Sequence, residues 1–300
     1  MSTLQRQAII GNTRFDNVTM SEAVERILRL VHKADAPQHV CTGNLDHLAL
    51  LSKDPEFRGI YSSAALVLAD GMPIVWLSHL RPDTRPLAER VAGSDLLLEL
   101  CRASAWTGLR LFFLGGPPEA AERAAELLRE RFPGVQICGT YCPPKETFDT
   151  PEEQAKIAQR IHATTPDVLL VGLGAPKQEK WIARYKMTLG VPVSIGVGGS
   201  FEMAAGMVRR APRWVRKVGM EWSWRLMQDP KRLYRRYICR DMPLLAKLIL
   251  EAVALRLGLQ QPQDIPVRTL ISEPRPLTPK VNITVASARM PDSAEVATPK

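Results

Sequence analysis

One carboxylate follows a short apolar run, at a position where α/β enzymes keep reactive groups. Leu66–Ala69 are all apolar and have the length of a strand that is buried on both faces. Asp70 comes next, and Gly71 and Pro73 then suit a turn and the first turn of a helix. A carboxylate at the carboxyl end of a parallel strand can take a proton from a substrate hydroxyl group. This pattern alone leaves two roles open for Asp70: it is a catalytic base, or it only caps the following helix.

A second strand end with small polar residues comes earlier in the chain. Val40–Thr42 has the pattern of a short buried strand, and a turn and a helix begin at Gly43 and Asn44. Thr42 and Asn44 therefore stand at a strand end, as Asp70 does. Two strand ends with polar side chains are thus fewer than thirty residues apart.

Glycines follow three later strand candidates, at Gly115–Gly116, Gly172–Gly174 and Gly196–Gly199. Glycine lets a ligand approach the backbone closely, and the free amide groups of the next helix can face an anion. Together the three strand ends favour a nucleotide diphosphate site; the alternative is that the glycines only make tight turns. The sequence contains neither GxGxxG nor GxxxxGK[ST], so we expect neither a dinucleotide site nor a P-loop.

Several common catalytic motifs are absent from the sequence. There is no Asp-x-Asp pair of the kind that holds a divalent ion, and the five histidines show no HxH or HxxxH spacing. Gly198–Glu202 lacks the closing glycine of a serine hydrolase elbow. The groups that remain suit binding a nucleotide diphosphate and removing a proton from an alcohol. We therefore expect a reaction that needs no metal and no cofactor.

The positive charge of the chain is concentrated in one segment. The net charge of the 300 residues is +9, and residues 208–240 hold eleven Arg and Lys against two acidic residues, so the remainder of the chain is neutral. Such a segment needs an anionic partner: nucleic acid, a phosphate-bearing substrate or a membrane surface. The odd number of cysteines, five, and an amino terminus without an export leader favour a cytoplasmic protein with reduced thiols.

The hydrophobic pattern predicts an α/β fold with a mostly parallel, Rossmann-like sheet and flanking helices. From Leu109 to Val197 strand and helix patterns alternate, with strands at 109–114, 135–138, 167–172 and 191–197 and helices at 119–132, 151–163 and 177–189. Earlier, Thr19 and Glu22 form a capping box before a helix, and Asp54–Pro55 opens another. We expect an α/β catalytic body at residues 1–207.

After Gly199 the pattern changes to helices without strands. We expect helices at 212–228, from 229–230 onward and at 242–259, which form a basic appendage at 208–259, and disorder in the proline-rich tail 260–300. Arginines and aromatic residues alternate in the appendage, which suits lipid headgroups or a diphosphate. The alternative is a solvated helix face. The arginines in question are Arg209, Arg210, Arg225, Arg232, Arg235 and Arg236.

Several motifs together resemble those of the WecG/TagA/CpsF glycosyltransferases, over roughly residues 8 to 258. They are ADG at 69–71, RVAGSDL at 90–96, FFLGG at 112–116, GLGAPKQEKW at 172–181, GVGGSFE at 196–202 and the RRAP...GMEW...RL..DP.RL.RRY pattern at 209–237. The resemblance implies metal-independent, inverting transfer of a sugar, N-acetylmannosamine most commonly, from a UDP-sugar to a polyprenyl-diphosphate-linked saccharide. It further implies surface-polymer synthesis at the cytoplasmic face of the membrane, with an appendage that contacts the membrane.

The resemblance also assigns roles to individual residues. Asp70 matches the proposed catalytic base, and Thr42 and Asn44 match a small polar pair beside it. Arg90 and Gln178 match motif positions near the donor. With the glycine strand ends, the expected substrate-binding residues are Thr42, Asn44, Arg90, Gly115, Gly116, Gly174, Gln178, Gly198 and Glu202. Two positions depart from the family pattern: Glu202 stands where Asp is frequent, and Gly43 where Asn is common.

Two other classes of function remain as alternatives. A nucleotide-sugar epimerase or dehydrogenase would use NAD, which the missing dinucleotide fingerprint disfavours. A nucleic-acid-binding module built on the basic segment would leave the Asp70 strand end and the glycine strand ends without a role. We expect no nucleic acid partner, and the sequence leaves a homo-oligomer open.

Overall fold

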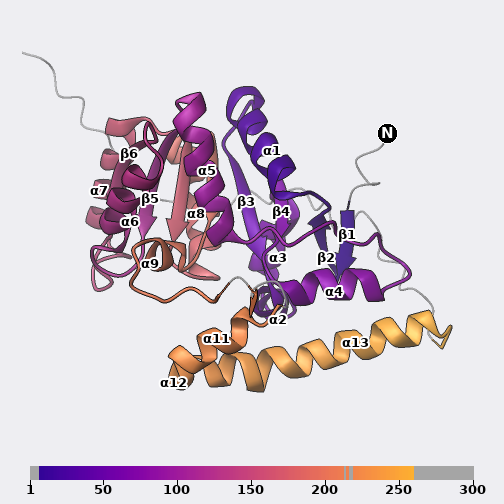
Figure 1. Cartoon of the computed structure of the whole chain (residues 1–300). Coiled ribbons are helices and arrows are strands. Elements are labelled where there is room, and N and C mark those ends of the chain that lie inside the picture. The colour runs from indigo at the N-terminus through magenta and orange to yellow at the C-terminus, as the bar shows by residue number, and fades with distance from the viewer. Residues whose placement is uncertain (1–6, 213, 216–218, 260–300) are drawn as a thin grey trace, which may run out of the picture.

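A six-stranded parallel sheet forms the centre of the computed structural model, which describes residues 7–212, 214–215 and 219–259 (Figure 1). The strand order is β4-β3-β8-β7-β5-β6, and every neighbouring pair is parallel. The strands are β3 (Gln38–Gly43), β4 (Leu66–Ala69), β5 (Arg110–Gly115), β6 (Gln136–Tyr141), β7 (Val168–Gly172) and β8 (Val193–Gly196). The predicted α/β class with a parallel sheet is therefore confirmed.

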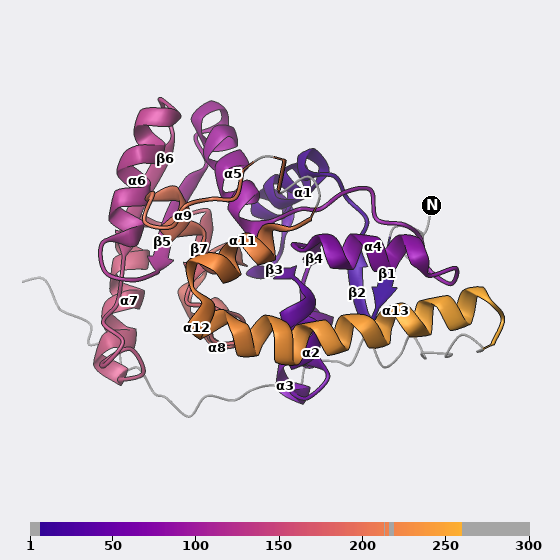
Figure 2. The same ribbon diagram turned by 60° about the horizontal axis from the view of Figure 1, so that its bottom comes forward.

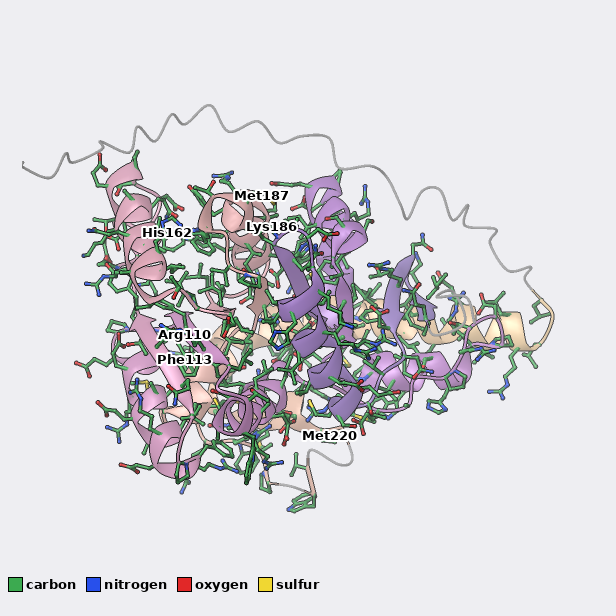
Figure 3. All side chains as sticks on the ribbon, turned by 90° about the horizontal axis from the view of Figure 1, so that it is seen from above. Arg110, Phe113, His162, Lys186, Met187 and Met220 are labelled. Atoms are coloured by element: carbon green, nitrogen blue, oxygen red, sulfur yellow. The ribbon has the colours of Figure 1, made fainter. Side chains whose placement is uncertain are left out.

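Helices cover both faces of this sheet, as the alternating pattern requires. One face packs against α1 (Met20–Lys33), α5 (Gly93–Thr107), α6 (Ala120–Arg131) and α9 (Ser200–Ala204). The other face packs against α2 (Leu45–Leu51), α3 (Pro55–Ser63), α7 (Pro151–Thr164) and α8 (Lys177–Leu189). Successive strand residues enter opposite cores, so Phe113 contacts the α6 side and Phe112 the α7 side. Phe113 lies inside the body and Met187 at its surface (Figure 3).

Side-chain caps set the first residues of several helices in the amino-terminal part of the chain. The Thr19 side chain accepts the N–H of Glu22 and the Glu22 carboxylate accepts the N–H of Thr19, so the capping box is confirmed. Asn44 caps α2 and Asp54 caps α3 through side-chain oxygens. By contrast, α5 begins at Gly93, after Ala92, and has no side-chain cap. Outside the six-stranded sheet, β2 (Thr13–Asp16) pairs with β1 (Gln7–Ile10) as an antiparallel hairpin.

The carboxy-terminal helices lie along the edge where the strands end. α11 (Glu221–Gln228), α12 (Pro230–Tyr234), the π-helical segment η2 (Arg235–Asp241) and α13 (Met242–Arg256) follow one another beneath the sheet in Figure 1. In Figure 2, α13 crosses in front of α2, and it also packs on η2 and α4 (Met72–Leu80). The division of the chain at residue 208 stays a prediction, and the predicted tail 260–300 lies outside the described residues.

The predicted helix at 212–228 is interrupted at Gly219. This residue has a left-handed φ of +74°, and a Cβ atom there would lie 2.4 Å from Cζ2 of Trp76. A side chain would therefore clash with α4, and only glycine accommodates both the backbone angle and the close approach. Residues 219–220 form a turn, so the described helix starts at Glu221. The turn brings α11 against the end of β4.

Candidate functional site

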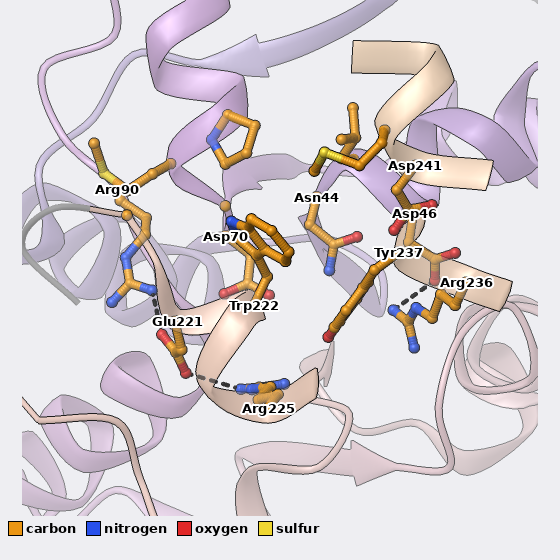
Figure 4. Close-up of a pocket in the computed structure, with 16 residues that line it drawn as sticks. Asn44, Asp46, Asp70, Arg90, Glu221, Trp222, Arg225, Arg236, Tyr237 and Asp241 are labelled. Atoms are coloured by element: carbon orange, nitrogen blue, oxygen red, sulfur yellow. Dashed lines mark hydrogen bonds and ion pairs between the residues drawn. The ribbon is translucent and has the colours of Figure 1, made fainter. Parts of the chain in front are cut away.

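A cavity of about 120 Å³ lies between the carboxyl ends of β3 and β4 and the helices α11 and η2 (Figure 4). Its polar lining groups come from five places in the sequence: Asn44 and Asp46 after β3, Asp70 after β4, Arg90 before α5, Glu221, Trp222 and Arg225 on α11, and Arg236, Tyr237 and Asp241 on η2. Ligand sites usually exceed roughly 300 Å³, so a nucleotide sugar would extend beyond this space.

Asp70 stands where the β3–β4 ladder ends. Its backbone N–H donates to the Gly43 carbonyl (2.8 Å), and its carboxylate accepts the N–H of Gly93 in the first turn of α5 (3.2 Å). The alternative that Asp70 only caps the following helix is wrong, because α4 is preceded by Gly71 and has no side-chain cap. The carboxylate is aimed at the cavity and partly buried.

The surroundings of Asp70 make it more basic than an ordinary aspartate. Burial raises its pKa, and the nearby Glu221 carboxylate raises it further, while the guanidinium groups of Arg90 and Arg225 lower it. The raising effects prevail, so the pKa of Asp70 lies above its usual value. A general base with a raised pKa accepts a proton more readily from an alcohol as the reaction proceeds.

A chain of ion pairs connects Asp70's neighbours. Glu221 pairs with Arg90 (Oε2 to Nη1, 2.8 Å) and with Arg225 (Oε1 to Nη2, 3.0 Å). Asp95 on α5 pairs with the other nitrogen of Arg90 (3.0 Å) and with Arg210. The chain therefore joins α11 to the start of α5. Arg90 and Glu221 have side chains that are only 14% exposed, so their attraction is less screened than that of a surface pair.

A second set of ion pairs fastens η2 to α2. The buried carboxylate of Asp46 pairs with Arg236 (2.5 Å) and with Arg240. Between this anchor and Glu221, the rings of Trp222 and Tyr237 meet edge to face at 6.3 Å. Both aromatic residues line the cavity. Their rings therefore face the site, whereas Trp214 and Tyr234 are 70% and 55% exposed and fit the expected membrane-facing role better.

The glycine strand ends lie farther along the same edge of the sheet. Gly115, Gly172 and Gly196 end β5, β7 and β8. The Gln178 side-chain oxygen accepts the N–H groups of Gly174 (3.2 Å) and Gly198 (3.0 Å) and so ties two of these loops together. The space beside Gly174 and Gly198 is open. Their loops therefore offer accessible backbone rather than side chains.

A buried carboxyl group holds Gln178 in place. The Gln178 side-chain nitrogen donates to Oε1 of Glu179 (2.8 Å), and both residues are buried. Burial raises the pKa of Glu179 to about 7. Its other oxygen is buried without a hydrogen-bond partner in the described part of the chain, which favours the protonated form.

The structure brings together some of the predicted site residues. Asn44, Asp70, Arg90, Arg225 and Arg236 line the cavity. Other predicted residues lie outside its lining: Thr42, Gly115, Gly116, Gly174, Gln178, Gly198, Glu202, Arg209, Arg210 and Arg235. Thr42 is buried, and its hydroxyl group donates to the Gly196 carbonyl (2.8 Å), so it joins β3 to β8.

The remaining predicted residues take several positions. Arg210 donates to Ser94 (3.1 Å) and pairs with Asp95. Arg209 and Arg235 are exposed, and the Glu202 carboxylate lies beside Gly199. Arg232 belongs to α12, and its side chain lies outside what the structure describes.

The sequence patterns do not single out Glu221 and Asp46 as site residues. Glu221 enters them only as one of the two acidic residues of the basic segment, although it is the third residue of the GMEW motif. Asp46 follows Asn44 by two residues and could have been found as a carboxylate in the first turn of a helix at a strand end. Within the described residues, no group of three or more His, Cys, Asp and Glu side chains could hold a metal ion.

A parallel α/β sheet that presents a basic carboxylate and three arginines in one cavity suits an enzyme for an anionic substrate. Residues 8–257 match the model of the family described as "Glycosyl transferase WecG/TagA/CpsF family". The chain belongs to this family and is a glycosyltransferase. The resemblance found in the sequence motifs is thereby confirmed.

Three similar proteins share the name N-acetylglucosaminyldiphosphoundecaprenol N-acetyl-beta-D-mannosaminyltransferase. The chain is 33% identical over 183 residues to the protein of that name from Bacillus spizizenii (strain ATCC 23059 / NRRL B-14472 / W23), covering 61% of this chain and 68% of the relative. It is 31% identical over 222 residues to those from Staphylococcus aureus strains MW2 and MRSA252, covering 74% of this chain and 84% of each relative.

Proposed function

We propose that this protein transfers N-acetylmannosamine from a UDP-sugar to an N-acetylglucosamine carried on undecaprenyl diphosphate, with inversion and without a required metal, in the synthesis of a surface polymer. The observation that carries the proposal is the cavity in which Asp70 lies beside Arg90 and Arg225. The relatives' name supplies the sugar and the acceptor.

The mechanism follows from what the cavity residues can do. Asp70 accepts the proton of the acceptor hydroxyl group while that oxygen bonds to the anomeric carbon of the donor sugar. The bond from this carbon to the UDP oxygen breaks, and UDP leaves with the electron pair. Such a displacement needs one base and inverts the anomeric carbon. Arg90 and Arg225 are placed to stabilise the negative charge that grows on the leaving diphosphate.

Two regions bind different parts of the donor: the cavity, and the glycine loops farther along the edge of the sheet. Asn44 and the two arginines lie beside Asp70, and we assign them to the sugar and diphosphate. Gln178 holds the Gly174 and Gly198 loops in place, and we assign the open space beside these two glycines to the rest of the nucleotide.

The carboxy-terminal helices provide a surface that suits a membrane. Leu250, Leu257 and Leu259 are 70%, 67% and 74% exposed on or just after α13, and Arg235 and Tyr234 are exposed at the start of the same helical stretch. No helix in the described residues has the length and apolarity needed to cross a bilayer. We propose that this face lies on the cytoplasmic surface of the membrane and brings the lipid-linked acceptor to Asp70.

A direct transfer assay tests the function. The full chain is incubated with UDP-N-acetylmannosamine and N-acetylglucosaminyl-diphosphoundecaprenol, with UDP-N-acetylglucosamine and UDP-glucose as parallel donors, each with and without EDTA. We expect a lipid-linked disaccharide from the first donor, formed equally well with EDTA. Product from another donor instead would contradict the proposed sugar, and no product from any donor would contradict the function.

A further inference from the structure

We propose that Glu221 is a positioning residue of the transfer reaction, whose carboxylate fixes the guanidinium groups of Arg90 and Arg225 and offsets their charge beside Asp70. The proposal rests on the function proposed above.

The geometry shows one carboxylate shared by two cations. In Figure 4 the Glu221 side chain lies between the two arginines, and each of its oxygens faces one of them, at 2.8 Å from Arg90 and 3.0 Å from Arg225. Arg90 lies before α5, and Arg225 lies one turn after Glu221 on α11. Because both oxygens are used, rotation of the Glu221 carboxylate would release an arginine from its position. Charge-assisted pairs of this kind set direction as well as distance.

The other acidic groups around the cavity already have cationic partners of their own. Asp95 pairs with Arg210 besides Arg90, and Asp46 holds Arg236 and Arg240. The charged or titratable groups that face the cluster from α5, residue 210, α2 and η2 are Asp95, Arg210, Asp46, Arg236, Tyr237, Arg240 and Asp241. Among the residues that the structure describes, Arg225 forms its ion pair with Glu221. A neutral side chain at position 221 would leave two arginines with less compensation beside Asp70.

The charge offset affects both the base and the binding of the donor. Arg90 and Arg225 lower the pKa of Asp70, and Glu221 raises it. Without the negative charge of Glu221, Asp70 would become a weaker base, and the two arginines would attract the donor diphosphate more strongly before the reaction starts. Stronger ground-state binding with a weaker base lowers both KM and kcat. A residue with a purely structural role would not produce this combination.

The test compares the wild-type chain with Glu221→Gln over a range of pH. We expect kcat to fall about tenfold, KM for the donor to fall severalfold, and the acidic limb of the kcat profile to move to lower pH by up to about one unit. Glu25→Gln is the matched control, because Glu25 pairs with Arg29 on α1 with its side chain 65% exposed and changes the net charge equally. An unchanged acidic limb, or a raised KM with unchanged kcat, would overturn the proposal.

A second variant separates charge from geometry. Glu221→Asp keeps the negative charge but is one methylene shorter, so it cannot reach both arginines as well. We expect a lower kcat with the acidic limb where the wild type has it; a limb that moves as in Glu221→Gln would overturn the charge role.

The Kd for UDP tells a failure of this inference from a failure of the proposed function. It needs no transfer, so Glu221→Gln should bind UDP severalfold more tightly even if every donor sugar tried is wrong. Weaker or equal UDP binding by the variant would overturn the charge offset while leaving the transferase function intact.

Discussion

The two halves of the sheet's carboxyl edge offer a substrate different chemistry. At β3 and β4 the chain presents ionised side chains, with Asp70 between Arg90 and Arg225. At β7 and β8 it presents backbone, with open space beside Gly174 and Gly198. The first half is completed by helices that come more than a hundred residues later, and the second is built from strand, turn and helix in immediate succession.

This difference suggests that one half of the edge serves the chemical step and the other half serves substrate binding. A proton transfer needs groups whose charge and direction are controlled, and here ion pairs between distant segments provide the control. A nucleotide can be held by backbone amides that a loop of fixed shape provides. We therefore expect changes near Asp70 to affect kcat, and changes in the glycine loops to affect folding and donor binding.

The largest effect after loss of the base is predicted for Arg225. Arg225→Ala removes a cation from the leaving diphosphate, so kcat/KM should fall about 100-fold, or roughly 2.7 kcal/mol. Steady-state kinetics with the UDP-sugar donor measures the loss. Arg102→Ala, which removes an exposed arginine from α5, is the control and should stay within about twofold of wild type. Equal losses of kcat/KM in Arg225→Ala and Arg102→Ala would contradict a special role for the arginines beside Asp70.

The glycine half should be sensitive to a single added methyl group. A Cβ atom at Gly172 would lie 2.8 Å from Cδ2 of Phe201 and 2.9 Å from the Gly198 carbonyl oxygen. Gly172→Ala should therefore lower the free energy of unfolding by about 2 kcal/mol. Gly59→Ala, in α3 with nothing within 4 Å of the new atom, should raise it by about 0.5 kcal/mol. Chemical denaturation of both variants checks the pair, and an undisturbed Gly172→Ala variant would argue against a tightly packed loop.

The buried carboxyl behind the glycine loops should make stability depend on pH. The pKa of Glu179 is raised to about 7 in the folded chain, so between about pH 4.5 and 7 the folded state holds a proton that the unfolded state has lost. This contribution to the free energy of unfolding is therefore lost as pH rises through that window. The free energy of unfolding of Glu179→Gln, taken relative to that of the wild type, should therefore rise by about 2 kcal/mol from pH 5 to pH 8.

Two buried histidines change the free energy of unfolding with pH in the opposite direction. The quantity to measure is therefore the difference in this free energy between Glu179→Gln and wild type. Burial lowers the pKa of His39 to about 4 and that of His47 to about 3, which makes stability rise with pH below about 6.5. These contributions cancel in the comparison of Glu179→Gln with wild type at each pH. A difference that stays constant from pH 5 to 8 would show that Glu179 does not titrate in this window.

The smallest effect is predicted for the exposed leucines on and just after α13. Changing Leu250, Leu257 and Leu259 together to Ser should weaken binding to anionic vesicles at least tenfold, while kcat for a water-soluble acceptor analogue stays unchanged. Met187→Ser is the control, since Met187 is 63% exposed on α8. Vesicle co-sedimentation measures both, and undiminished binding of the triple variant would contradict a membrane contact through these leucines.

Local signals predicted the fold well because its elements are regular and locally capped. The helix at 177–189 has the bounds expected from the sequence, and the strands before and after it differ by one or two residues. The position of Asp70 at a strand end could be read in the same way. The predicted role of Thr42 in the cavity is not supported by its position. Thr42 stands at the predicted strand end, but its side chain turns toward Gly196 inside the sheet.

The rest of the site could not be predicted because it depends on contacts between distant segments. Arg90 and Glu221 are 131 residues apart in sequence, and a turn at Gly219 that fits against Trp76 brings them together. Nothing in the local pattern around 212–228 distinguishes that turn from a continuous helix. The local pattern likewise does not separate aromatic residues that face lipid from those that face a substrate, and Trp222 and Tyr237 line the cavity.

The most direct test of the central claim is to measure UDP binding and sugar transfer on one preparation of Asp70→Asn. Asparagine keeps the size of the side chain and can still accept the N–H of Gly93, but it cannot take a proton. We expect the variant to bind UDP at least as tightly as wild type and to transfer sugar about 1,000-fold more slowly. Transfer at the wild-type rate would contradict the account, because Asp70 would then not be the base.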